Sequence, residues 1–150
     1  MKKSRVYADT SVFGGCFDDE FSEESNTFFQ EVKDGKFILV ISYVTLRELS
    51  KAPEEVKRVL DDLPTEHVEF IEYIEEISIL RDAYLSANIL GPSGRSDAEH
   101  IASASVAEVD FVISWNFNHI VHYDKIIQYQ AVNLMNGYKS IQIYSPKEVV

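Results

Sequence analysis

The run Phe37–Ile41, which reads FILVI, is the stretch that decides the fold. It has the length of a β-strand and no polar face, which is typical of a strand covered on both sides in a parallel sheet. Working outward from it, Arg5–Ala8 and Phe111–Trp115 are two further short strands of the buried kind. His67–Ile71 and Ile141–Tyr144 alternate polar and apolar residues, so we predict that they form the remaining strands.

Segments in which apolar residues recur at helical spacing lie between these strands. They are Thr27–Val32, Thr45–Leu49, a segment that Pro53 opens, Ile74–Ala87, a segment that starts with the capping box Ser96–Glu99, and Asn118–Asn136. Strands that alternate with helices indicate a parallel sheet between two layers of helices. We therefore predict an α/β fold with three layers and a central, mostly parallel sheet, formed by one domain over residues 1–150.

The charge balance argues against loose binding of nucleic acid. The chain has 25 acidic and 14 basic residues, which gives a formal net charge of −11. Binding to the phosphate backbone is driven by Lys and Arg side chains that displace counterions. A function on nucleic acid therefore requires a local site rather than a basic surface.

Cysteine usage and hydropathy narrow the class of protein further. Cys16 is the only cysteine, which excludes an internal disulfide and a metal site built from several thiolates. No apolar run approaches the roughly 20 residues that a membrane span needs, and the N-terminus leads into a strand rather than a signal-peptide core. We therefore expect a cytoplasmic protein with no membrane contact.

Polar side chains follow the predicted strands at the ends where an α/β sheet binds its ligands. Asp9 ends the first strand, Glu48 lies one short helix beyond the run at 37–41, Asp97 begins a helix, and Asn116 follows a later strand. Taken singly, each is accounted for as a helix-end, surface or turn residue. Together they supply the oxygen ligands that Mg²⁺ or Mn²⁺ prefers. We expect the four to meet at one rim of the sheet.

Four segments carry a resemblance to a known family. They are Val6–Ser11 (VYADTS), Thr45–Leu49 (TLREL), Ser96–Ala102 (SDAEHIA) and Val112–Asn116 (VISWN), and they resemble the successive motifs of PIN domains. The match runs in order over nearly the whole chain. The resemblance implies a compact α/β fold and a ribonuclease that depends on Mg²⁺ or Mn²⁺. Many such domains are toxins of bacterial and archaeal toxin–antitoxin pairs.

The resemblance also assigns roles to residues. It implies that Asp9, Glu48 and Asp97 are the metal ligands and, with Asn116, the catalytic set. The family often has an aspartate where this chain has Asn116, so one carboxylate is missing there. Glu99 is a candidate substitute, although a role in the helix capping box accounts for it equally well. The implied chemistry is metal-assisted hydrolysis of single-stranded or structured RNA.

Other residues near these motifs have auxiliary roles in this interpretation. Thr10, Ser11 and Ser114 are candidate supports of the site, and Arg47 and Arg95 are candidate contacts to substrate phosphates. Trp115 is the aromatic residue best placed to meet a base. His119 and His122 are three residues apart without further ligands at suitable spacing, so we interpret them as helix-surface residues rather than a zinc site.

Two alternatives stay open from the sequence. The first is a catalytically weakened PIN domain that binds RNA or a protein without cutting, with Asn116 as the mark of lost activity. The second is another doubly wound domain with Asp at a strand end, such as a receiver or a haloacid-dehalogenase-like phosphatase, although the acidic residues that these need beside Asp9 are missing. The family resemblance further implies RNA, an antitoxin protein and a second copy of the chain as partners.

Overall fold

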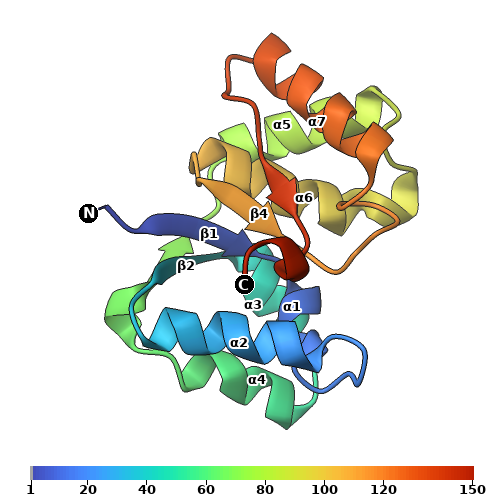
Figure 1. The fold of residues 1–150 in the computed structure, drawn as a ribbon. Coiled ribbons are helices and arrows are strands. Elements are labelled where there is room, and N and C mark those ends of the chain that lie inside the picture. The colour runs from blue at the N-terminus through green and yellow to red at the C-terminus, as the bar shows by residue number, and fades with distance from the viewer. Residues whose placement is uncertain (1) are drawn as a thin grey trace.

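The computed structural model describes residues 2–150 and contains a five-stranded sheet in the order β3-β2-β1-β4-β5 (Figure 1). The strands are β1 (Ser4–Ala8), β2 (Phe37–Ser42), β3 (Val68–Ile71), β4 (Phe111–Ile113) and β5 (Ile143–Tyr144). All four pairings between neighbours are parallel. The predicted α/β fold with a parallel sheet is confirmed.

Two layers of helices cover the two faces of the sheet. The helices are α1 (Thr10–Gly15), α2 (Ser22–Lys33), α3 (Tyr43–Leu49), α4 (Glu54–Asp61), α5 (Glu75–Ser86), α6 (Arg95–Val106) and α7 (Tyr123–Met135). Figure 1 shows α2 and α4 on one side of the sheet and α5, α6 and α7 on the other. None of the helices in residues 2–150 is long and apolar enough to cross a membrane.

The alternation of side chains along the strands explains the two cores. Tyr7 and Val40 pack with the buried face of α5 and α6, whereas Val6, Ala8 and Leu39 pack with α1, α2 and α4. Successive residues of a strand point to opposite faces, so a continuous apolar run is what a sheet buried on both sides requires. This is the physical reason that FILVI predicts the fold.

Two local predictions are wrong. The helix predicted from Asn118 begins only at Tyr123, and a turn precedes it. The capping box predicted at Ser96–Glu99 is absent, because α6 begins at Arg95 with Gly94 as its N-cap and without a side-chain cap. Both segments lie beside the predicted site, which is where local rules give way to tertiary contacts.

Candidate active site

Asp9 lies directly after the central strand and is 3% exposed. It stands at the N-cap of α1, but its side chain makes no capping hydrogen bond. The carboxylate instead accepts from the Ser11 hydroxyl at Oδ1 (2.5 Å) and from the Ser114 hydroxyl at Oδ2 (2.8 Å). Burial raises the pKa of Asp9, and the neighbouring Asp97 carboxylate adds to the rise. The chain thus keeps a costly buried carboxylate at the end of β1.

Glu48 is held by two partners at the same oxygen. The Thr10 hydroxyl donates to Oε1 over 2.6 Å, and Nε2 of His100 lies 2.6 Å from that atom. Burial works against ionisation of Glu48, but the hydrogen bond and charge of His100 outweigh it and lower the pKa of the carboxyl. Glu48 is therefore an ionised carboxylate with a fixed orientation.

His100 lies behind Glu48 and is 1% exposed. Its Nδ1 is 2.6 Å from the Tyr7 hydroxyl, which is 2.8 Å from the Ser42 hydroxyl. Burial works to lower the pKa of His100, but the hydrogen bond with Glu48 reverses this and raises it. His100 is not among the site residues that the sequence motifs predict. Its position three residues after Asp97, on one face of a helix, is the signal that could have indicated it.

Asp97 is the third residue of α6 and pairs with a histidine from a distant turn. Its Oδ2 lies 2.7 Å from Nδ1 of His119. His119 is in the turn between β4 and α7, so its interpretation as a helix-surface residue is wrong. This pair joins the turn after β4 to the start of α6, and Ser114, also after β4, donates to Asp9 at the end of β1.

Asn116 follows β4, as predicted, and its side-chain oxygen has backbone partners. Oδ1 accepts from the amides of Asn118 (3.2 Å) and His119 (2.9 Å). The main-chain N–H of Asn116 in turn donates to the Ser114 hydroxyl over 2.9 Å. Its predicted place in the catalytic set stays a prediction.

Glu99 is engaged away from the carboxylates of Asp9 and Glu48. It accepts a hydrogen bond from the Tyr43 hydroxyl (2.6 Å) and lies near the guanidinium groups of Arg47 (3.6 Å) and Arg81 (3.5 Å). Glu99 therefore joins α6 to α3 and α5, which is a structural role. Its predicted auxiliary role at the site receives no support from these contacts.

Several of the remaining predicted residues hold these carboxylates. Ser11 and Ser114 hold Asp9, Thr10 holds Glu48, and the Ser11 hydroxyl also accepts from the Trp115 amide at 2.9 Å. Trp115 is buried and stacks on Phe21, so its ring is a packing group. Arg47 is half-exposed and donates to the Ser96 hydroxyl, whereas Arg95 lines a separate pocket at the end of α5.

The donor set fits a hard divalent cation by its chemistry. Two aspartates and one glutamate offer oxygen atoms, and an ionised carboxylate has about four lone-pair sites, so bonds to hydroxyl groups leave acceptor capacity. In the arrangement described for residues 2–150, no three His, Cys, Asp or Glu side chains converge closely enough to hold an ion as they stand. Binding of an ion by all three carboxylates therefore requires that these side chains move closer together than they are in this structure.

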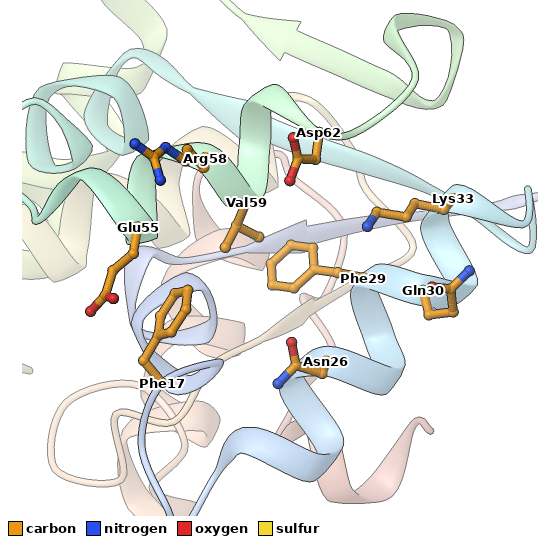
Figure 2. Close-up of a pocket in the computed structure, with 9 residues that line it drawn as sticks. All are labelled: Phe17, Asn26, Phe29, Gln30, Lys33, Glu55, Arg58, Val59 and Asp62. Carbon is orange, nitrogen blue, oxygen red and sulfur yellow. The ribbon is translucent and has the colours of Figure 1, made fainter.

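A pocket lies away from these carboxylates. Figure 2 shows a pocket of about 280 Å³ between α2 and α4, where Phe17, Phe29 and Val59 form an apolar floor. Lys33 and Asp62 stand at its rim (Figure 2). None of the predicted site residues lines it.

Comparison with known proteins places the fold. No protein-family model matches the sequence, and no curated protein is significantly similar to it. Comparison with solved structures shows that the protein has a PIN-like fold. It resembles a chain of VapBC2 from Rickettsia felis, crystallised with a DNA fragment from its promoter, with 12% identity, a TM-score of 0.57 and coverage of 94% of this chain and 98% of that one. It also resembles a chain of FitAcB from Neisseria gonorrhoeae, with 12% identity, a TM-score of 0.57 and coverage of 95% and 98%.

Proposed function

We propose that the protein is an endoribonuclease that depends on Mg²⁺ or Mn²⁺ and cuts single-stranded or structured RNA. The observation that supports the proposal is a set of three oriented carboxylates in a PIN-like fold: Asp9 after β1, Glu48 on α3 and Asp97 at the start of α6, with His100 bonded to Glu48 and acting on the pKa of Asp9. Each carboxylate has its own positioning partners. Hydrogen bonds that orient several acidic groups are typical of a metal centre. Carboxylates on a solvated surface do not need them.

The roles of the residues follow from their surroundings. Asp9, Glu48 and Asp97 would hold the cation, which supplies an activated water and neutralises charge that develops on the phosphate. Ser11, Ser114 and Thr10 hold two of these carboxylates by hydrogen bonds. Arg47, half-exposed beside Ser96, is available to bind a neighbouring phosphate of the substrate.

Partners follow from the same comparison. The similarity to chains of VapBC2 and FitAcB supports an antitoxin protein as a partner of this chain. The homodimer is part of the proposal through the family resemblance of the sequence motifs. The net charge of −11 supports a complex in which the partner contributes the basic surface. Cytoplasmic location belongs to this proposal, as does the interpretation of residues 1–150 as one PIN-like domain.

A cleavage assay tests the proposed activity. The purified protein is incubated with labelled single-stranded RNA over a titration of Mn²⁺, with EDTA as the blank. We expect cleavage that requires the metal and is lost in Asp97→Asn. The matched control is Asp124→Asn, which removes an exposed aspartate from the first turn of α7 and leaves the rim intact. Absence of cleavage in the wild type at every Mn²⁺ concentration would contradict the proposal.

The absence of the fourth carboxylate supports a second candidate. With an amide at 116 that already accepts two backbone hydrogen bonds, the rim has one negative charge fewer than the family pattern. A domain of this kind would bind RNA or a protein without cutting it. Metal-dependent RNA binding without any cleavage product in the same assay would favour this candidate.

A further inference from the structure

We infer that Asn116 is a positioning residue that fixes His119 against Asp97, and that His119 orients the Asp97 carboxylate for the cation. This inference rests on the proposed function, because it takes Asp97 as a metal ligand. It differs from the expectation that Asn116 itself supplies an oxygen to the ion. The two interpretations differ in the results that they predict for Asn116→Ser and for the double variant with His119→Ala.

The turn between β4 and α7 is built around Asn116. Its side-chain oxygen accepts from the amides of residues 118 and 119, and its main-chain carbonyl accepts from the amides of Ile120 (3.1 Å) and Val121 (2.8 Å). Four successive backbone donors therefore point at one residue. An asparagine side chain commonly organises a turn in this way by accepting from its own backbone two residues on.

A second contact fixes the same turn from the side of α7. The buried Tyr129 hydroxyl donates to the carbonyl of His119 over 2.8 Å. The backbone of His119 is thus held at its amide by Asn116 and at its carbonyl by Tyr129. Because the amide and the carbonyl of His119 are both fixed, its imidazole extends toward α6 from a defined backbone position.

The imidazole of His119 meets Asp97 at one oxygen only. Nδ1 lies 2.7 Å from Oδ2, and Oδ1 has no hydrogen-bond partner among residues 2–150. A hydrogen bond to one carboxylate oxygen fixes the plane of the group and leaves the other oxygen for an ion. Outer partners of this kind change metal affinity about 10–100-fold when they are removed.

Asn116 also reaches Asp9 through a shared hydroxyl. Its main-chain N–H donates to Ser114 Oγ, and this hydroxyl donates to Asp9 Oδ2. The Ser114 hydroxyl therefore connects the main chain of the turn to Asp9, and substitution of the Asn116 side chain leaves this main-chain donor in place. The contribution of the Asn116 side chain is its pair of hydrogen bonds from the amides of residues 118 and 119.

Calorimetric titration with Mn²⁺ is the first test. We expect His119→Ala and Asn116→Ala each to weaken Mn²⁺ binding about 10–100-fold. The double variant should be no weaker than the single variants, because both remove the same support. Asn116→Ser should restore most of the affinity, since a serine hydroxyl forms the same turn more weakly. Asn118→Ala, an exposed asparagine in the same turn, is the matched control and should bind Mn²⁺ as the wild type does.

A second measurement needs no metal and no activity. Nuclear magnetic resonance of the metal-free protein reports the ¹⁵N shift of the His119 imidazole and the exchange rates of the amides of 118 and 119. Asp97→Asn and Asn116→Ala should both shift the imidazole signal, and Asn116→Ala should speed exchange of the two amides. Because His119 is 34% exposed at its side chain, its replacement by alanine should leave the fold intact.

The results separate the inference from the proposed function. A wild-type protein that neither binds Mn²⁺ nor cuts RNA overturns the proposed function, and the imidazole and exchange measurements then decide the inference alone. An unchanged His119 signal in Asn116→Ala overturns the inference. So does a pattern in which Asn116→Ser binds Mn²⁺ as weakly as Asn116→Ala, or in which the losses in the double variant add, since either would make Asn116 a ligand.

Discussion

The two ends of the central strand β1 both carry charged residues, and the two sets of contacts differ in kind. At the amino end, Arg5 makes hydrogen bonds to opposite charges and to carbonyl groups. At the carboxyl end, Asp9 accepts hydrogen bonds from two hydroxyl groups and has the Asp97 carboxylate as a neighbouring like charge. The same strand thus begins in a neutralised cluster and ends in one with excess negative charge.

Most hydrogen-bond donors of Arg5 have an acceptor. The guanidinium forms a forked pair with Glu69 on β3 and donates to the carbonyls of Ala107 (2.9 Å) and Glu108 (3.1 Å). The amide of Arg5 donates to Asp110 over 2.7 Å. These bonds join β1 to β3 and to the loop before β4. The hydrogen bond with Glu69 raises the pKa of Arg5, as expected for a pair that stabilises the fold.

The acidic end shows the opposite balance. Among the hydrogen bonds of residues 2–150, Asp9 accepts from two hydroxyl groups, and the side-chain nitrogen partners are His100 at Glu48 and His119 at Asp97. Clustered carboxylates repel one another when no cation neutralises them. A strand end that keeps such a cluster is better explained by binding of a cation than by stability. The comparison separates charges that hold the fold from charges that serve a site.

The largest expected effect is on activity at the acidic end. Asp9→Asn removes one ligand charge but little volume, so we expect RNA cleavage to fall at least about 100-fold while the fold persists. The rate is measured with Mn²⁺ on single-stranded RNA, and circular dichroism checks the fold. If Asp9→Asn cuts RNA as fast as the wild type, the two ends of β1 do not differ in the way described.

Arg5→Met tests the other end, and we expect the reverse pattern. Loss of the guanidinium leaves Glu69 without its partner and two carbonyls without a donor, which should lower the free energy of unfolding by about 2 kcal/mol. Urea denaturation measures this change. Cleavage by the folded variant should match that of the wild type, because Arg5 lies at the far end of the strand. A loss of activity in the folded fraction would contradict the separation of roles.

Stability without metal gives a smaller effect of opposite sign at the acidic end. Because burial and Asp97 disfavour the charged form of Asp9, Asp9→Asn should raise the free energy of unfolding by about 1 kcal/mol in EDTA. Saturating Mn²⁺ should remove the advantage, since the ion stabilises only the wild-type site. The two urea midpoints, with and without Mn²⁺, sharpen the comparison. A variant less stable than the wild type in EDTA would show that the carboxylate supports the fold.

The smallest effect concerns Cys16, a titratable group near the acidic end without a proposed role. Burial raises the pKa of the thiol from its ordinary value of 9 to about 11. Alkylation at pH 8 should therefore be about 100-fold slower in the folded protein than in urea. The unfolded thiol loses its proton first, so this group lowers stability as the pH rises from about 9 to about 11. Cys16→Ala should flatten that dependence.

Much of the fold was predictable because its signals are local. Continuous or alternating apolar residues indicate FILVI and the other strands. Asp9 is predicted as a site residue because it directly follows a strand. The start of α7 was not predictable, since Asn116 and Tyr129 capture backbone groups of the turn that a helix would otherwise use.

The missed parts of the site depend on contacts between distant residues. His100 forms a hydrogen bond with Tyr7, which lies 93 residues earlier in the sequence. No pattern of residues around position 100 predicts that contact. The capping box at Ser96 failed for a similar reason, because Glu99 is bound by Tyr43 from another helix. Asn116 drew attention by its place in a motif, but its contacts with the turn required the structure.

The long sequence separations within the site have a consequence for synthesis of the protein. Asp9 is made early, but Ser114, which bonds to it, lies 105 residues later, and His119 follows Ser114. On the ribosome, β1 can pair with β2 long before β4 exists. A nascent chain therefore has no complete set of positioning partners until residue 119 of 150 has been added. Under the proposed cleavage of RNA, this order would keep the message under translation away from a finished site until synthesis is nearly over.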